Sequence, residues 1–420
     1  MRYWLLWLGV VIGGGAFAQN ATLDNVTLEG HQRNQVDYLL RFVESQPGQL
    51  FSPVQALRDA QRLRNLYSVA HATFRLDTLS GERLHLVFVI EEAWTLFPIF
   101  SINGVEGNVW YEVGASEINF LGRGINVTGA YRNIDGRSNY QLFFRQPYLW
   151  GRSFGVWAGI HRYASTEPLY FSEGAVFYDY TNLSFDMGVT YEFTPGHLVE
   201  FGGVYFIEDY LKVSEQELEN PPGPDNLRIP KGLFKLVHRF DRINYTYFYQ
   251  DGLFNMTLLE TVYNSNDGSW FHLFLNDLHY YRRVGRHGNL AFRLRLGLST
   301  NVNSPFAPFV LDSRVNIRGA GNRIDRGTGT LVLNTEYRHT LYEGNLMAIQ
   351  GVAFSDLGSW RTAGGRFDDF VNPDYIRHFI GPGLRLVYKK AHNAVFRLDY
   401  GFDLFQAGEQ GLVIGFGQYF

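Results

Sequence analysis

The most informative stretch of the sequence is Ser313–Arg338, SRVNIRGAGNRIDRGTGTLVLNTEYR. Its first part is a loop rich in glycine and arginine that contains Ile317-Arg318-Gly319, and its second part resembles a strand that carries Glu336 and Arg338. Segments with β-type alternation lie on both sides of it. If those segments form a closed barrel in a membrane, a charged arginine has no stable place on the lipid face. We therefore expect this loop to fold into the lumen of a barrel.

Alternation of apolar and polar residues recurs along most of the chain. From Leu290 to Leu298 every second residue is leucine or phenylalanine, and the positions between them carry alanine, arginine and glycine. The same pattern returns in Phe396–Leu404 and Leu412–Phe416. A strand of a water-soluble sheet would look the same locally. Repetition over the whole length favours a barrel over a sandwich.

Sixteen segments fit this pattern, and an even number of strands of about ten residues suits a closed transmembrane barrel. Such a barrel returns its last strand beside its first and leaves no free edge if that seam is sealed. The proline-rich segment Lys212–Pro230 is expected to be a loop, because proline cannot serve a central strand. The predicted strands are 108–120, 124–133, 138–149, 153–164, 177–193, 197–210, 232–245, 254–264, 269–283, 289–300, 306–312, 329–341, 345–360, 378–389, 393–405 and 411–420.

The composition also favours a transmembrane β-barrel. After residue 20 charges interrupt every apolar run, and the mean hydropathy is only -0.16. Aromatic residues nevertheless make up 16% of the chain, with 26 Tyr and 35 Phe, beside 45 Gly. A barrel needs apolar residues only at alternate positions and gathers aromatics at both interfaces. A water-soluble sandwich or propeller is the main alternative, and the net charge of -4 argues against a nucleic-acid partner.

The first 18 residues are typical of a secretory signal peptide. Arg2 supplies the positive start, Trp4–Ile12 the apolar core, and Ala16-Phe17-Ala18 a small-residue cleavage site. The apolar run of about 15 residues is shorter than the roughly 20 that a transmembrane helix needs. The absence of cysteine excludes a disulfide framework, although an exported protein could contain one.

Residues 21–93 have a mixed pattern that predicts a β-α-α-β-β unit. Ser52 is expected to cap the second helix, with Pro53 at its first position and Gln55 at its third. The predicted elements are a strand at Ala21–Gly30, helices at Asn34–Glu44 and from Ser52 to about Leu66, and strands at Val69–Leu76 and Leu84–Ile90.

The segments NVTLEG, PGQLFSPVQALRDAQRL and LHLVFVIEE in this unit resemble a POTRA domain, the periplasmic module of outer-membrane assembly and secretion proteins. The resemblance implies that a free sheet edge receives extended client segments by strand addition. A generic αβ sandwich is the alternative.

The chain as a whole, with residues 94–420 as its barrel, resembles the BamA/TamA superfamily, the bacterial surface antigen barrels. The order of several short motifs along the chain carries this resemblance. They are EVG with NFLGRG at 112–124, RQPYL at 145–149, FDRIN with QDG at 240–252, IRG at 317–319, FSDLG at 354–358, GPGLR at 381–385 and RLDYG at 397–401.

In that superfamily the loop arginine points into the lumen and pairs with acidic groups on the wall. The resemblance therefore implies that Arg318 pairs with Asp356, with Asp399 and Glu336 as alternatives. Two departures stand out. Ala320 replaces the usual aromatic of the loop motif, and Gln418 stands where barrel signals often carry an aromatic.

The resemblance implies an integral outer-membrane insertase or translocase that needs no nucleotide, metal or cofactor. Its partners would be unfolded outer-membrane or secreted clients and the lipid bilayer, with periplasmic or lipoprotein accessory factors as further candidates. The seam between the first and last strands would open laterally, and Gly415, Gly417 and Phe420 are expected at that seam. A dedicated two-partner secretion pore and a passive porin-like barrel are the rival hypotheses.

An enzymatic role is not expected. The sequence contains no glycine-rich phosphate loop, no nucleophile elbow and no pair of histidines at metal-binding spacing. The adjacent Glu91 and Glu92 follow a predicted strand, and we interpret them as solvated side chains rather than a catalytic pair.

Overall fold

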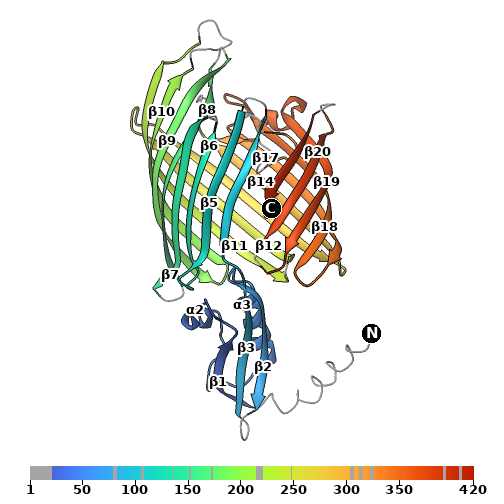
Figure 1. Ribbon diagram of the computed structural model, residues 1–420. Coiled ribbons are helices and arrows are strands. Elements are labelled where there is room, and N and C mark those ends of the chain that lie inside the picture. The colour runs from blue at the N-terminus through green and yellow to red at the C-terminus, as the bar shows by residue number, and fades with distance from the viewer. Residues whose placement is uncertain are drawn as a thin grey trace.

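The computed structural model describes residues 21–420 except 79–82, 106–107, 135, 151–152, 172–173, 214–220, 247, 303–306, 312–315, 322–325, 391–393 and 406–408. The predicted signal peptide therefore lies outside the described residues. A small N-terminal domain lies below a large sheet that curls round on itself (Figure 1). Among the described residues, none of the helices combines the length and the apolar character needed to cross a bilayer.

The N-terminal domain contains two helices and a three-stranded sheet. The chain order is β1 (Thr22–Glu29), α2 (Val36–Leu40), α3 (Pro53–Arg64), β2 (Val69–Thr78) and β3 (Arg83–Glu92). The sheet order is β1-β3-β2, in which β1 runs parallel and β2 antiparallel to the central strand β3. This is a mixed sheet in which, among the described residues, β2 has a free outer edge. The start of β1 is instead bonded on its outer side to residues 48–51, with the Leu23 amide donating to the Gln49 carbonyl at 2.8 Å.

Helix α3 forms where the capping pattern predicts it. The Ser52 hydroxyl accepts a hydrogen bond of 3.3 Å from the Gln55 amide, and Pro53 opens the helix. Ala56, Ala60 and Leu63 lie on its buried face at helical spacing and belong to the domain core. Helix α2 is shorter than the predicted Asn34–Glu44, because after Leu40 the backbone continues with tighter i to i−3 bonds such as Phe42 N to Leu39 O.

The remaining strands form one 16-stranded antiparallel sheet, which confirms the predicted strand number and class. The strands follow one another in chain order from β4 at one end to β21 at the other. They are β4 (Leu96–Val105), β5 (Asn108–Phe120), β6 (Ile125–Ile134), β7 (Arg137–Trp150), β8 (Phe154–Phe171), β9 (Gly174–Thr194), β10 (His197–Lys212), β11 (Asn226–Thr246), β12 (Tyr249–Asn264), β13 (Trp270–Val284), β14 (Gly288–Ser299), β17 (Gly329–Glu343), β18 (Met347–Arg361), β19 (Ile376–Tyr388), β20 (Val395–Asp403) and β21 (Gln410–Phe416).

One predicted strand is wrong and one strand of the sheet was missed, so the two errors cancel in the count. The sheet begins with β4, which the prediction missed, so 108–120 is its second strand. Pro98 obscured β4 in the sequence, yet an edge strand tolerates proline. Conversely, 306–312 is no strand of the large sheet. Of the described residues 307–311, Phe309–Val310 (β15) form a short strand paired with Arg326–Gly327 (β16), and Leu311 is buried in an interior cluster.

Pro230 lies in a strand rather than in the predicted loop. It pairs in register with Ile207, while the ladder to β12 begins only at Lys231. The Pro230 carbonyl accepts a bond from the Ser265 amide on the β12 side. Because the N–H and C=O of one strand residue point to the same side, the missing donor falls beyond the end of that ladder.

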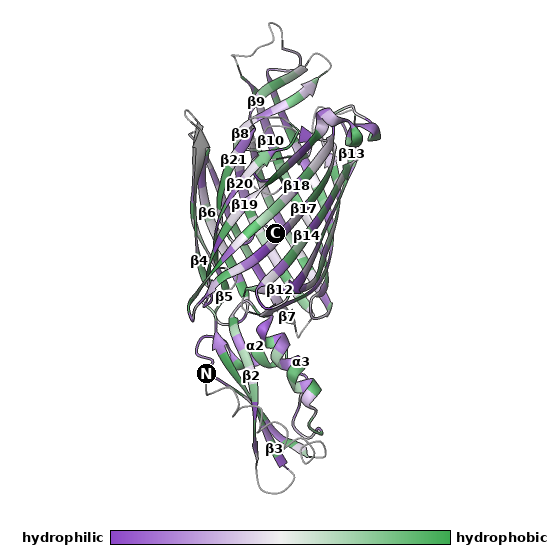
Figure 2. Ribbon diagram, turned by 90° about the vertical axis from the view of Figure 1, so that its right-hand side faces the viewer, coloured by the Kyte–Doolittle hydropathy of each residue, from purple (hydrophilic) through white to green (hydrophobic). Residues whose placement is uncertain are grey.

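The two faces of the sheet differ in character, as the alternation predicts, and both residue types alternate along the strands in Figure 2. Phe292 and Leu294 of β14 are exposed on the outer face, whereas Arg293 between them is buried on the inner face. The inner face therefore carries the charges. Among the described residues no strand ladder joins β4 to β21, so each of these end strands has one hydrogen-bonded neighbour.

Glu92 organises the junction between the N-terminal domain and the sheet. Its carboxylate accepts bonds from the Arg33 amide at 3.0 Å and from the Asn34 amide and side chain, both at 2.8 Å. Asn34 in turn accepts from the Asn119 side chain at 3.0 Å, at the turn between β5 and β6. Burial alone would raise the pKa of Glu92, but the hydrogen bonds from Asn34 and Arg33 outweigh it and hold this pKa below its ordinary value.

We expect Glu92→Gln to weaken this junction. The Arg33 and Asn34 amides should lose protection by about 1–3 kcal/mol in opening free energy, the range for hydrogen bonds to charged groups. Because folding lowers the pKa of Glu92, its contribution is complete above the ordinary glutamate pKa of about 4.3 and is lost as pH falls through the folded value. Hydrogen exchange on the full chain measures both effects. Glu29→Gln, which removes an exposed pair with Arg75, is the control and should change little. Equal effects would contradict this role.

Candidate functional site

The loop between β14 and β17 returns into the interior of the sheet. Ile317 and Arg318 are both fully buried, and Asn316 is nearly so. The Asn316 side chain accepts a bond of 3.0 Å from Arg295 on β14, and its carbonyl accepts one of 2.8 Å from Asn334 on β17. The loop is thus attached to the inner wall next to the motif arginine.

Arg318 forms a bidentate pair with Asp356 of β18. Its Nε and Nη2 lie 2.8 and 2.9 Å from the two carboxylate oxygens, and its backbone amide donates to the same group at 2.9 Å. The Asn334 side chain supplies a fourth donor to Asp356 at 2.9 Å. A fork-to-fork pair of this kind fixes both the position and the angle of the guanidinium.

Glu336 of β17 links Arg318 to two further arginines. It accepts hydrogen bonds from Arg318 Nη1 and Arg338 Nε, and Arg385 Nη2 of β19 lies 3.3 Å away. Arg385 also donates to Asp399 of β20 at 2.7 Å. Asp399 itself is 3.9 Å from Arg318 Nη1, so it is an outer member of the cluster rather than the main partner.

These side chains form a buried charge cluster with more positive than negative groups. Arg318, Arg338, Arg385, Asp356 and Asp399 have no exposed surface, and Glu336 has 2%. Arg397 of β20 adds a fourth arginine, and its Nε and Nη1 have no hydrogen-bond partner among the described residues. Four guanidinium groups therefore face three carboxylates.

Glycines let the loop backbone lie directly on the wall. Gly319 has φ +94°, a left-handed conformation that favours glycine. Gly401 of β20 and Gly411 of β21 are paired in register, and a Cβ on either would collide with backbone atoms of Arg318 or Gly319. Gly358 similarly leaves room for the Ile317 side chain. The backbone of the loop itself makes this contact with the wall, so the wall positions must lack a Cβ.

Two aromatic rings cover the guanidinium of Arg318. The Phe354 ring centroid lies 3.8 Å and the Tyr419 ring centroid 4.5 Å from its central carbon. Both distances suit cation–π contacts. The sequence motif lacks its usual aromatic at Ala320, and a ring from a segment about 100 residues further along the chain lies on the arginine instead.

The structure brings the predicted lumen residues together in one cluster. Arg318 meets Asp356 and Glu336, and Arg338 donates to Gln250 at 2.7 Å. Sequence reasoning assigned no role to Asn334, Arg385, Arg397, Gly401, Gly411 or Tyr419. Arg385, Arg397 and Gly401 did lie inside motifs that were noticed, GPGLR and RLDYG, whereas Tyr419 gave no local signal.

Of the three residues predicted at the seam, Gly415 lies on the end strand β21, whereas Gly417 and Phe420 lie beyond it. Phe420 does not line the edge of β21. Its ring lies inside the sheet, 6.0 Å from the His279 ring, because the chain turns inward after Phe416. Gly415 is on β21, where a Cβ would meet the Arg397 guanidinium. Gly417 makes the turn, with φ +81°.

Comparison with solved structures identifies the fold. BamA from Haemophilus ducreyi lacking POTRA domains 1–3 matches 94% of this chain and 83% of its own, at 13% identity and a TM-score of 0.57. CdiB from Escherichia coli matches 94% of this chain and 75% of its own, at 11% identity and a TM-score of 0.61. CdiB from Acinetobacter baumannii matches 95% of this chain and 74% of its own, at 12% identity and a TM-score of 0.56. No protein-family model and no curated protein matches the sequence.

We expect Arg318→Ala to destabilise the folded chain by about 3–5 kcal/mol, because it leaves buried carboxylates without their main counter-charge. Arg318→Lys should restore little, since an ammonium cannot reproduce the fork. Urea unfolding in detergent micelles measures the change. Arg228→Ala, which removes an exposed pair with Asp209, is the matched control and should cost less than about 1 kcal/mol. A loss at Arg318 no larger than the control would remove the loop from the site.

Proposed function

We propose that this chain is an integral outer-membrane protein that inserts client β-strands into the membrane through the seam between β4 and β21. The observation that carries the proposal is the combination of an unpaired seam with a filled interior. No ladder joins β4 to β21 among the described residues, while the Arg318 loop occupies the interior through buried ion pairs. The seam, rather than the interior, offers a client somewhere to bind.

The seam offers a client the backbone edges of two strands, β21 and β4. β21 is short, with seven residues, and within the part of the chain that the structure describes it pairs with β20 alone, as β4 does with β5. Unpaired strand edges are templates for another chain. In hydrocarbon a client strand must satisfy every backbone N–H and C=O, and an edge that supplies partners lowers that cost.

The N-terminal domain supports a step that precedes insertion. Its order β-α-α-β-β and the free outer edge of β2 fit a POTRA domain, which would bind an extended client by strand addition. The domain also reaches the base of the seam. Glu91 pairs with Lys390, which follows β19, and the Trp94 amide donates to the Lys390 carbonyl at 3.2 Å. A client held on this domain would lie next to the seam.

Two other functions make different predictions. The likeness to CdiB leaves room for a dedicated secretion pore, in which the Arg318 loop would be a plug that leaves the lumen. A passive porin would need an open interior, and the buried loop argues against it. An outer-membrane location with the N-terminal domain in the periplasm fits both transport functions. The proposal includes no enzymatic activity, metal or cofactor.

Depletion of the protein followed by quantitative outer-membrane proteomics tests the client range. We expect the amounts of several unrelated β-barrel proteins to fall together, because strand templating depends on backbone atoms rather than on a client's side chains. Loss of one secreted or surface protein, with other barrels unchanged, would instead indicate a secretion pore and reject the insertase.

Closing the seam covalently should stop insertion. The chain has no cysteine, so Leu96→Cys with Phe416→Cys gives one reactive pair across the seam. Joining the two sites with a thiol-specific crosslinker should abolish client insertion into liposomes, and cleavage of the crosslinker should restore it.

The matched control shares one of the two positions. Phe396→Cys with Phe416→Cys joins register partners of β20 and β21, whose rings are 5.6 Å apart, and leaves the seam free. This pair should retain insertion when crosslinked. Equal activity of both crosslinked proteins would contradict a lateral route.

A further inference from the structure

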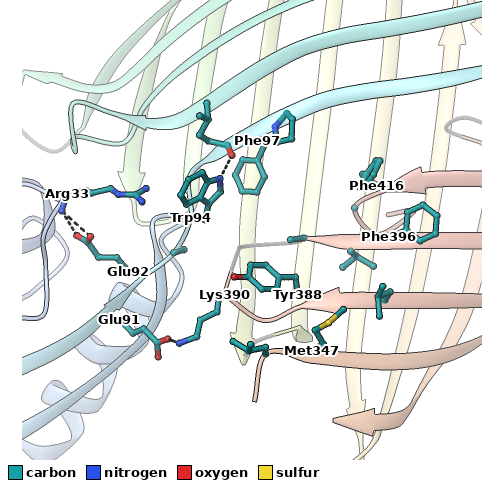
Figure 3. A pocket seen from close by; sticks show the side chains of 18 of the residues that line it. Arg33, Glu91, Glu92, Trp94, Phe97, Met347, Tyr388, Lys390, Phe396 and Phe416 are labelled. Atoms are coloured by element: carbon teal, nitrogen blue, oxygen red, sulfur yellow. Dashed lines mark hydrogen bonds and ion pairs between the residues drawn. The ribbon is translucent and has the colours of Figure 1, made fainter. Parts of the chain in front are cut away.

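A cavity lies on the inner face of the sheet, far from the seam. The seam itself has a cavity of 1360 Å³ beside Trp94 and Phe396 (Figure 3), which belongs to the client route proposed above. A separate cavity of 500 Å³ is lined by residues of β8 to β13, which stand in the middle of the strand order. Strands β8, β9 and β10 rise above their neighbours at the end away from the N-terminal domain (Figure 1). We call this second space the wall cavity.

The wall cavity has the size and part of the lining of a small-molecule site. Such sites occupy about 300–1,000 Å³ and combine an apolar lining with a few polar groups. Four leucines from three neighbouring strands line it, and Phe309 of β15 forms another side. The interior of a membrane barrel is ordinarily polar, so these leucines provide contact for an apolar body rather than for water. They are Leu233, Leu258, Leu273 and Leu275.

Three tyrosines give the wall cavity a continuous aromatic surface. The Tyr180 ring centroid lies 6.1 Å from that of Tyr163 and 4.9 Å from that of Tyr210. The Tyr180 hydroxyl donates to Glu208 at 3.0 Å, and the Tyr163 hydroxyl donates to Glu167 at 3.3 Å. A carboxylate acceptor makes a phenol ring richer in electrons, and the face of such a ring attracts cations.

Three carboxylates line the wall cavity, and two of them are paired. Glu208 accepts from the Lys231 ammonium at 2.5 Å, and Glu167 pairs with Arg326 of β16. Glu260 of β12 is the third. Within the part of the chain that the structure describes, its carboxylate makes no hydrogen bond and no ion pair. The lining therefore has one negative charge that is not matched by a direct partner.

Lys235 is the nearest source of a counter-charge, but it turns elsewhere. It is the register partner of Glu260 on β11, and its charge acts on Glu260 only from a distance. Its ammonium lies over the Trp157 ring, 4.1 Å from the centroid, and Lys235 does not line the wall cavity. A carboxylate that is partly removed from water is costly without a paired cation. A cation bound in the cavity would supply that partner.

We propose that the wall cavity binds a small organic cation, an ammonium group carried on a compact apolar body. Glu260 supplies the counter-charge, the tyrosine rings contact the ammonium group, and the leucines contact the body. An anion would be repelled by Glu260, and a neutral molecule would leave its charge unmatched. Binding of this cation goes beyond client insertion and does not depend on it, because the wall cavity and the seam cavity share no residue.

The loop that carries Arg318 also forms part of the wall cavity. Phe309 of β15 and Arg326 of β16 both belong to this loop and line the space. A ligand there would lie between the wall and the β15–β16 pair. We therefore expect it to slow hydrogen exchange at Val310 and Gly327, the register partners of Arg326 and Phe309. This protection reports where the ligand binds.

Two probes of the same shape test the charge requirement. Choline carries a quaternary ammonium group, and its neutral carbon analogue has carbon in place of that nitrogen. Isothermal titration calorimetry on the full chain in detergent micelles measures both affinities. We expect choline to bind roughly tenfold more tightly than the analogue, since only a cation gains from the rings and from Glu260. Choline should also protect the β15–β16 pair from exchange.

Variants separate binding from folding. Glu260→Gln should lower the affinity for choline to that of the analogue, a loss of roughly tenfold. The same change should not lower stability in urea without ligand, because it removes a charge that has no direct partner. Tyr163→Leu keeps an apolar side chain but removes a ring, and should also weaken choline alone. Glu343→Gln, which removes an exposed pair with Lys389, is the control and should change neither affinity.

Equal affinities for choline and its analogue would overturn the proposal, as would the absence of choline binding. An unchanged choline affinity in Glu260→Gln, or binding without protection of the β15–β16 pair, would place the cation elsewhere and reject the site. All of these measurements use purified protein without a client. Failure of the depletion or seam-crosslinking tests would therefore reject the insertase and leave the cation site standing, and the reverse also holds.

Discussion

A guanidinium removed from water is stable only where carboxylates and aromatic rings surround it, and the interior of this protein is arranged around that requirement at Arg318. Asp356 and Glu336 lie on the inner faces of neighbouring strands, β18 and β17, and together reach three sides of the group. Placing these carboxylates inward also decides which residues of both strands face outward. Leu331 and Leu333 consequently lie on the outer surface.

The charge cluster is built from the strands on the β21 side of the seam. The carboxylates and arginines around Arg318 come from β17 to β20, and the loop backbone rests on glycines of β20 and β21. β4 begins the sheet at the other end and follows directly from the N-terminal domain. Glu91 and Trp94, which precede β4, contact Lys390, which follows β19 on the other side of the seam. β4 is therefore the strand of the seam that follows the N-terminal domain directly in the chain.

The end of the last strand lies against the arginine that makes none of the ion pairs described for the cluster. Tyr419 is 4.7 Å from the central carbon of Arg397 and 4.5 Å from that of Arg318. A tyrosine ring can face a buried arginine at a smaller desolvation cost than a carboxylate, since its face attracts a cation without carrying a charge. Tyr419, which follows the end strand β21, thus belongs to the charge cluster as well.

The sequence by itself determined the mainly β class and the number of strands, because a period of two is a local property, whereas the pairing of Arg318 with an acidic wall came from the resemblance to the BamA/TamA superfamily. The sequence analysis missed β4, because Pro98 masks this edge strand, and it predicted a strand at 306–312, where Leu311 is buried in an interior cluster. The sequence analysis named Asp356 first among three carboxylates, and the tertiary structure decided that Asp356 and Glu336 both bind Arg318 directly while Asp399 lies 3.9 Å away. The tertiary structure alone brought Tyr419 onto Arg318, because that contact joins residues about 100 positions apart after a turn at Gly417, and no local pattern encodes such a distance.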